Sequence, residues 1–132
     1  MFVRPMVRQG GMVRPMQAGD GLLANYVATA LTVDAPSTLT VAQLAGGLIL
    51  RSGASVGRTD TSPTAALIAA AFPDMDIGDS LSLRYSNTST QTMTLAAGVG
   101  VTASGRLAVL TLTALEIIFV KTGAATYNMI AI

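Results

Sequence analysis

The chain has 132 residues, of which 51% are hydrophobic and only 11% are charged, and its formal net charge is +1. The absence of cysteine and histidine excludes a disulfide framework, a thiolate zinc site, a cysteine nucleophile and the commonest general base. The near-neutral charge argues against nucleic acid as the main partner, and no stretch is continuously apolar over the about 20 residues that a membrane helix needs. A surface with so few charges favours association with copies of the chain or with a larger assembly.

Residues 1–24 differ in composition from the rest of the chain. Residues 3–6 read Val-Arg-Pro-Met and recur as residues 13–16, and prolines and glycines throughout the segment predict no regular element. Apolar side chains, and methionine in particular, suit irregular apolar surfaces better than solvent. We therefore expect an extended N-terminal arm over 1–24 that orders on a partner, with a disordered tail as the alternative. The side chains expected to bind that partner are Phe2, Val3, Arg4, Met6, Val7, Arg8, Met12, Val13, Arg14 and Met16.

The first part of residues 25–132 predicts two strands around a short helix. Residues 26–33 alternate as a strand does, and residues 34–37 carry turn residues. Thr40 is placed to cap a helical turn over 41–45 that Gly46 and Gly47 end. A short strand over 48–51 and a loop over 52–61 follow.

A second helix is expected over about 63–72. Thr61 or Ser62 is predicted to cap it, Pro63 suits its first turn, and Pro73 stops it. The remaining segments predict strands over 79–87, 92–96, 98–102, 106–113, 115–121 and 127–132. Short strands at such regular intervals predict a mainly β fold, namely an antiparallel β-sandwich or barrel-like domain with one short α-helix.

No group of residues predicts catalysis or a bound cofactor. The acidic cluster Asp74–Asp79 is expected to be a solvated turn, with a weak cation site as the alternative. Lys121 is interpreted as a solubilising residue at a strand end rather than as the activator of a serine or threonine nucleophile. The glycine-rich segments lack the residues of a phosphate loop and are expected to be tight turns. We therefore expect no enzyme, no cofactor and no metal ion.

Two further sequence patterns are the arginines that could form ion pairs and a glycosylation sequon. Arg51, Arg58 and Arg84 are expected to pair with Asp60, Asp79 or a carboxylate of a partner. Residues 87–89 match a glycosylation sequon, which we discount because the chain shows no secretion signal.

Leu107, Val109 and residues 115–120 are apolar enough to be buried on both sides of a sheet. They are interpreted as a sandwich core, with a subunit interface around a symmetry axis as the alternative.

Several segments together resemble a known family. They are residues 39–51, 58–66, 77–80, 85–88 and 94–102, and they resemble small virion proteins of tailed bacteriophages that decorate, or cement, the capsid. The resemblance covers about residues 38–105 and leaves out the arm. It implies a β-rich domain on the outer surface of the capsid, usually a trimer on local three-fold axes, bound to the major capsid protein. It carries over no catalytic residues.

We therefore expect a non-catalytic structural virion protein that stabilises a capsid by bridging major capsid protein subunits. The arm arginines are expected to pair with carboxylates on an acidic capsid surface. The alternatives are another virion component, such as a tail, neck or fibre module, and a small ligand-binding β-barrel.

Overall fold

The computed structural model describes residues 6–9, 12–15 and 26–132. Within these ranges the chain is mainly β, with two short helices. The elements after the N-terminal segment are β3 (Val27–Leu31), β4 (Ser37–Thr38), α1 (Val41–Gly46), β5 (Gly47–Arg51), β6 (Thr59–Thr61), α2 (Ala65–Ala71), β7 (Ser80–Asn87), β8 (Met93–Ala96), β9 (Val101–Ser104), β10 (Ala108–Val109), β11 (Thr113–Gly123) and β12 (Thr126–Ala131).

The larger sheet has six strands in the order β3-β5-β7-β11-β12-β9. Its long strands β7, β11 and β12 pair antiparallel, as expected, but β3 with β5, β5 with β7, and β12 with β9 pair parallel. The prediction of antiparallel sheets is therefore not confirmed, because both larger sheets are mixed. Alternation along a strand shows which side chains share a face, but it carries no information on the direction of the neighbouring strand.

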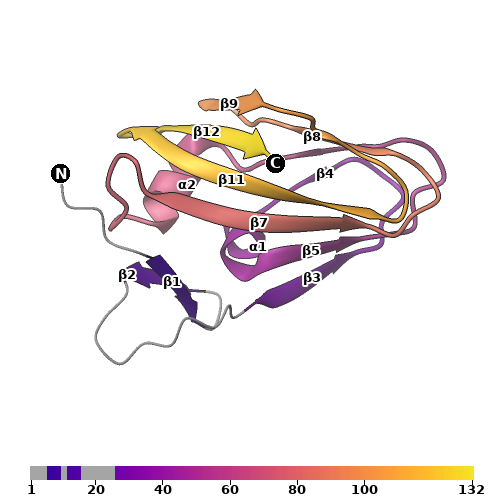
Figure 1. Cartoon of the computed structure of the whole chain (residues 1–132), viewed down its shortest axis with the longest axis horizontal. Coiled ribbons are helices and arrows are strands. Elements are labelled where there is room, and N and C mark those ends of the chain that lie inside the picture. The colour runs from indigo at the N-terminus through magenta and orange to yellow at the C-terminus, as the bar shows by residue number, and fades with distance from the viewer. Residues whose placement is uncertain (1–5, 10–11, 16–25) are drawn as a thin grey trace.

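The smaller sheet has the strand order β10-β8-β6-β4, and it too mixes parallel and antiparallel pairs. Buried side chains from both sheets and both helices belong to one hydrophobic cluster, whose large members include Leu44, Ile68, Leu83, Met93 and Phe119. Figure 1 shows the six-stranded sheet nearest the viewer, from β3 at the bottom to β9 at the top, with α1 and α2 behind it. One face of the large sheet therefore covers the core, and the other face does not.

Helix α1 forms where its local sequence predicts it. Thr40 caps it, since the Thr40 hydroxyl accepts from the Gln43 N–H at 3.1 Å while the Gln43 side chain accepts from the Thr40 N–H at 3.0 Å. Gly47 ends the helix with a φ of 82°, a left-handed conformation that glycine adopts without strain. The predicted cap and the predicted stop are both confirmed.

Helix α2 is shorter than expected, and its predicted cap is wrong. Its N-cap is Thr64, whose hydroxyl accepts from the Leu67 N–H. Ser62 is used elsewhere, because its hydroxyl donates to the Pro63 carbonyl and accepts from the Gly98 N–H. Ile68 is buried as the helical spacing predicts, but Leu67 is 56% exposed.

Several stretches differ from the predicted boundaries, among them β4, which begins in the predicted turn 34–37, and β11, which extends beyond the predicted 115–121 at both ends. The expected loop 52–61 contains β6, and the expected strand 106–113 shrinks to the two residues of β10. The expected strand 98–102 starts later, at Val101. Very short strands such as β6 and β10 depend on distant pairing partners, which local alternation does not reveal.

The N-terminal segment contains two strands that the sequence reading excluded. β1 (Met6–Gln9) and β2 (Met12–Pro15) pair antiparallel, with Met6 opposite Pro15 and Gln9 opposite Met12. The prediction that proline and glycine prevent any regular element is therefore wrong for these eight residues. Pro15 is the last residue of its strand, where proline is tolerated, and the sequence between the strands is Gly-Gly, a common hairpin pair.

Candidate functional site

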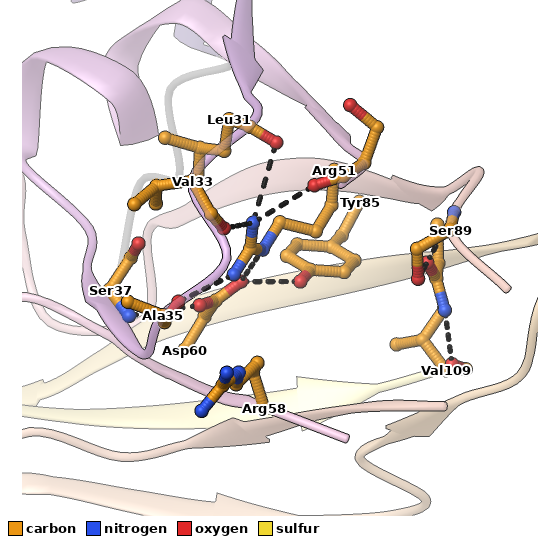
Figure 2. Close-up of polar contacts among 12 residues, drawn as sticks. Leu31, Val33, Ala35, Ser37, Arg51, Arg58, Asp60, Tyr85, Ser89 and Val109 are labelled. Atoms are coloured by element: carbon orange, nitrogen blue, oxygen red, sulfur yellow. Dashed lines mark hydrogen bonds and ion pairs between the residues drawn. The ribbon is translucent and has the colours of Figure 1, made fainter. Parts of the chain in front are cut away.

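A buried polar cluster joins the two sheets near one end of the large sheet. The Arg51 Nε lies 2.9 Å from the Asp60 Oδ2, and both side chains are fully buried. The Tyr85 hydroxyl donates to the same carboxylate oxygen, at 2.5 Å (Figure 2). We call Arg51, Asp60 and Tyr85 the buried clasp. It connects β5 and β7 of the large sheet to β6 of the small one.

The buried clasp uses its polar groups within the protein. The guanidinium also donates to the backbone carbonyls of Val33, Ser52 and Ala35, at 2.6, 3.1 and 2.7 Å. The second oxygen of Asp60 accepts from the Ser37 N–H at 3.1 Å. Burial and the hydrogen bond to Asp60 raise the pKa of Tyr85 far above its ordinary value. The arrangement therefore anchors the β3–β4 loop and presents no accessible acid, base or nucleophile.

A second polar cluster lies at the surface of the same loops. The Asp34 carboxylate accepts from the Ser55 N–H and hydroxyl and from the Arg58 guanidinium. The hydrogen bonds from Ser55, and then the pairing with Arg58, lower the pKa of Asp34 to about 2. Of the predicted arginine pairings, that of Arg51 with Asp60 is confirmed. Arg58 instead pairs with Asp34.

The sequon at residues 87–89 is not accessible in the folded chain. Asn87 is fully buried, and its side-chain amide donates to the Gln91 and Val109 carbonyls at 2.8 and 2.9 Å. Its amide oxygen accepts from the Ser89 N–H and hydroxyl. The sequon residues therefore serve the turn after β7.

The remaining chemical candidates have structural contacts. The Lys121 ammonium donates to the Met75 carbonyl at 3.0 Å, and the Asp79 carboxylate accepts from the Asp76 N–H at 2.8 Å. Among the described residues no group of three or more acidic, histidine or cysteine side chains is arranged to hold a metal ion.

Within the described part of the chain, one side of the six-stranded sheet is covered by no other helix or strand, and it carries many aliphatic side chains. We call it the open face. Its side chains alternate with those of the core, so that Leu81, Leu83 and Tyr85 of β7 point inward while Ser82, Arg84 and Ser86 point outward. Figure 1 looks onto this face, and no labelled helix or strand lies in front of it. Its aliphatic residues are Ala28, Ala30, Leu48, Leu50, Ala114, Ile118, Val120, Ile130 and Ile132.

One row across the open face places its charges side by side. The strand registers align Leu48 of β5 with Arg84 of β7 and align Arg84 with Glu116 of β11. Ile132 follows β12 and lies opposite Glu116, because its N–H donates to the Glu116 carbonyl at 3.0 Å. The Arg84 and Glu116 side chains are 57% and 45% exposed, and their charged groups lie 4.0 Å apart. The row therefore reads apolar, basic, acidic, apolar.

The apolar run 115–120 divides between the two sides of the sheet. Ile117 and Phe119 are buried in the core, as the sandwich-core interpretation predicts. Ile118 and Val120 lie on the open face and are half-buried. Phe119 is apolar because it packs in the core, but Ile118 and Val120 do not reach the core. The alternative interpretation, a subunit interface, therefore applies to Ile118 and Val120.

The ten residues expected to bind a partner all belong to the N-terminal segment. Met6, Val7 and Arg8 lie in β1, and Met12, Val13 and Arg14 lie in β2. Phe2, Val3, Arg4 and Met16 lie outside the described residues. The sequence reading missed the charged row and the aliphatic residues of β5 and β12 on the open face. Period-two alternation on β7 could have placed Arg84 on the outward face, but its neighbours on the other strands depend on registers that the sequence does not give.

None of the described helices is long and apolar enough to cross a membrane. No protein-family model, no curated protein and no solved structure matches the chain.

Proposed function

We propose that this chain is a non-catalytic structural virion protein that decorates a bacteriophage capsid from outside and stabilises it by bridging major capsid protein subunits. The observation that carries the proposal is the open face, a broad surface on which aliphatic side chains of β3, β5, β11 and β12 flank the Arg84–Glu116 ion pair and the serines of β7. Such a surface suits protein assembly better than exposure to water. The resemblance to capsid-decorating proteins supplies the identity of the assembly.

The polar groups inside the domain support a structural role. The buried clasp is saturated by hydrogen bonds within the chain, so its charges stabilise the fold rather than bind a substrate. We accordingly propose a two-layer β-sandwich that serves as a rigid head, with no cofactor, nucleic acid or membrane as partner.

The N-terminal segment would supply a second contact with the capsid. Residues 1–24 contain three arginines and no acidic residue before Asp20. The resemblance implies three copies around a local three-fold axis of the capsid, and the composition of residues 1–24 suggests that each copy would extend this arm to a neighbouring capsomer. Arginine pairs well with surface carboxylates, so the arm contact should weaken as salt increases.

Two other functions compete with this one. A tail, neck or fibre module would use the same kind of apolar face in a different part of the virion. A ligand-binding β-barrel would need a closed barrel, whereas the large sheet has two edge strands, β3 and β9, within the described part of the chain.

The test is cosedimentation of the purified chain with capsids of the bacteriophage that encodes it. We expect saturable binding, and we expect the full-length variant with Arg4, Arg8 and Arg14 all changed to alanine to bind more weakly at low salt. Leu67→Ser, on the exposed side of α2, is the matched surface control and should bind like the wild type. Absence of binding by the wild-type chain would refute decoration, and unchanged binding of the triple variant would refute the role of the arm.

A further inference from the structure

The charged row on the open face is self-complementary. From β5 to β12 the row is Leu48, Arg84, Glu116 and Ile132. When the row is laid against itself in the opposite direction, each Arg84 meets a Glu116 and each Leu48 meets an Ile132. A surface that joins two identical copies about a two-fold axis requires this property, because each residue meets a different residue of the same patch. We propose that the open face binds the open face of a second copy, making a weak dimer of the free chain.

The registers define where the axis would lie. A two-fold axis parallel to the strands, above the sheet and midway between β7 and β11, places β7 of each copy over β11 of the other. Arg84 of each copy then lies over Glu116 of the other, and the single ion pair becomes a square of four alternating charges. The same operation places Leu48 of each copy over Ile132 of the other, so apolar side chains flank the charges on both sides.

In the dimer both the charged and the apolar residues of the row gain favourable contacts. In the single chain Arg84 and Glu116 are largely solvated and 4.0 Å apart, a geometry that contributes little to stability. In the pair each charge gains a second opposite charge, and the apolar side chains of Leu48 and Ile132 flank the charges at the two ends of the row. Ile118 and Ile130, adjacent in the register between β11 and β12, extend the apolar surface beside the row.

The available area sets the expected affinity. Six strands about 4.8 Å apart, each presenting about five residues of about 3.3 Å, cover roughly 500 Å² per copy. The pair would bury roughly 1,000 Å² in total, which is at the lower limit for specific protein association. The dimer should therefore dissociate on dilution.

This inference does not depend on the proposed capsid function. It predicts two copies for the chain in solution, whereas the resemblance implies three copies on the capsid. Binding to the capsid and pairing in solution can thus fail separately, since one is measured with capsids and the other without them.

The first experiment measures mass against concentration by sedimentation equilibrium for the full-length chain, over roughly a hundredfold range of concentration. We expect a reversible equilibrium between one copy and two. Arg84→Glu and Glu116→Arg should each weaken the dimer at least about tenfold, because each places like charges over one another in the pair. Leu67→Ser on α2 should leave the equilibrium unchanged.

The second experiment mixes the two charge variants. Arg84→Glu carries two acidic residues in the row and Glu116→Arg carries two basic ones, so the equimolar mixture should form heterodimers at least as strong as the wild-type pair. The double variant R84E/E116R should pair with itself, which shows that the single variants fail through charge and not through misfolding. A wild-type mass of one or three copies at all concentrations, or a mixture that stays monomeric, would overturn the inference.

Discussion

Two arginines of the six-stranded sheet, Arg51 and Arg84, form carboxylate pairs in opposite environments. Arg51 and Asp60 are fully buried, 2.9 Å apart, and are surrounded by further hydrogen bonds, whereas Arg84 and Glu116 are about half exposed and 4.0 Å apart. The first pair joins β5 to β6 across the core, and the second joins the neighbouring strands β7 and β11 on the open face. The same kind of pair thus lies inside the domain in one case and on the open face in the other.

Burial decides what each pair can do. A buried pair repays the loss of hydration only when its polar atoms find further partners, and in the buried clasp each guanidinium nitrogen and each carboxylate oxygen has at least one. An exposed pair contributes little to folding, so its charges remain available to a partner. The chain therefore places one arginine–carboxylate pair in a hydrogen-bonded cluster inside the domain and leaves the other among aliphatic and serine side chains on the open face.

The largest predicted effect separates the two arginines. Arg51→Met should reduce the free energy of unfolding by about 3–5 kcal/mol, because it leaves the Asp60 carboxylate buried without its cation. Arg84→Met should change it by at most about 0.5 kcal/mol, since the Arg84 pair is exposed. Urea unfolding, at a protein concentration too low for pairing, measures both values.

If Arg51→Met and Arg84→Met unfold at the same urea concentration, the predicted difference in stability between the buried and the exposed pair is wrong. Equal, small losses would mean that the buried clasp contributes no more than the surface pair. Arg51→Lys is a useful third variant, because lysine keeps the charge but cannot reproduce the planar fork that contacts Asp60 and the loop carbonyls together, so most of the loss should remain.

A smaller effect separates two buried tyrosines. The Tyr85 hydroxyl donates to Asp60, while the Tyr127 hydroxyl is buried without a hydrogen-bond partner among the described residues. Tyr85→Phe should therefore lower the free energy of unfolding by about 1.5–3 kcal/mol, the range for a hydrogen bond to a charged group. Tyr127→Phe should be neutral or slightly stabilising, because it removes an unsatisfied polar atom from the core. Thermal or urea unfolding of the two variants side by side provides the measurement, and a greater loss for Tyr127→Phe would contradict the assignment.

The elements that the sequence predicted well are those whose signals are local. Thr40 and Gly47 mark the two ends of α1, and the alternation of Leu81, Leu83 and Tyr85 with polar residues gives the inward face of β7. These signals depend on backbone capping and on the pleat of a strand, which neighbouring residues determine.

The features that the sequence did not predict depend on distant contacts. β6 has three residues, and it exists because it pairs in parallel with β4 and β8. Asp60 on that strand was considered as a partner for Arg51, but nothing in its neighbourhood indicates that it is fully buried. The charged row needs the registers of three strand pairs at once, so Arg84 and Glu116 could not be placed side by side from either strand alone.

The smallest predicted effect concerns the surface of the loops that the buried clasp anchors. Asp34 accepts hydrogen bonds from Ser55 and pairs with Arg58, which lowers its pKa from the ordinary 3.8 to about 2. Because the pKa is lower in the folded chain, the contact stabilises the loops fully above about pH 4 and is lost as the pH falls toward 2. A titration of the Asp34 side-chain carbon by NMR should give this value. Ser55→Ala removes the hydroxyl bond, the largest single cause of the low pKa, and leaves the backbone N–H bond in place, so it should raise the pKa more than Arg58→Ala does. The opposite order would mean that the guanidinium of Arg58, through its own hydrogen bonds and its solvent-screened charge, and not the Ser55 hydroxyl, sets the protonation of this surface cluster.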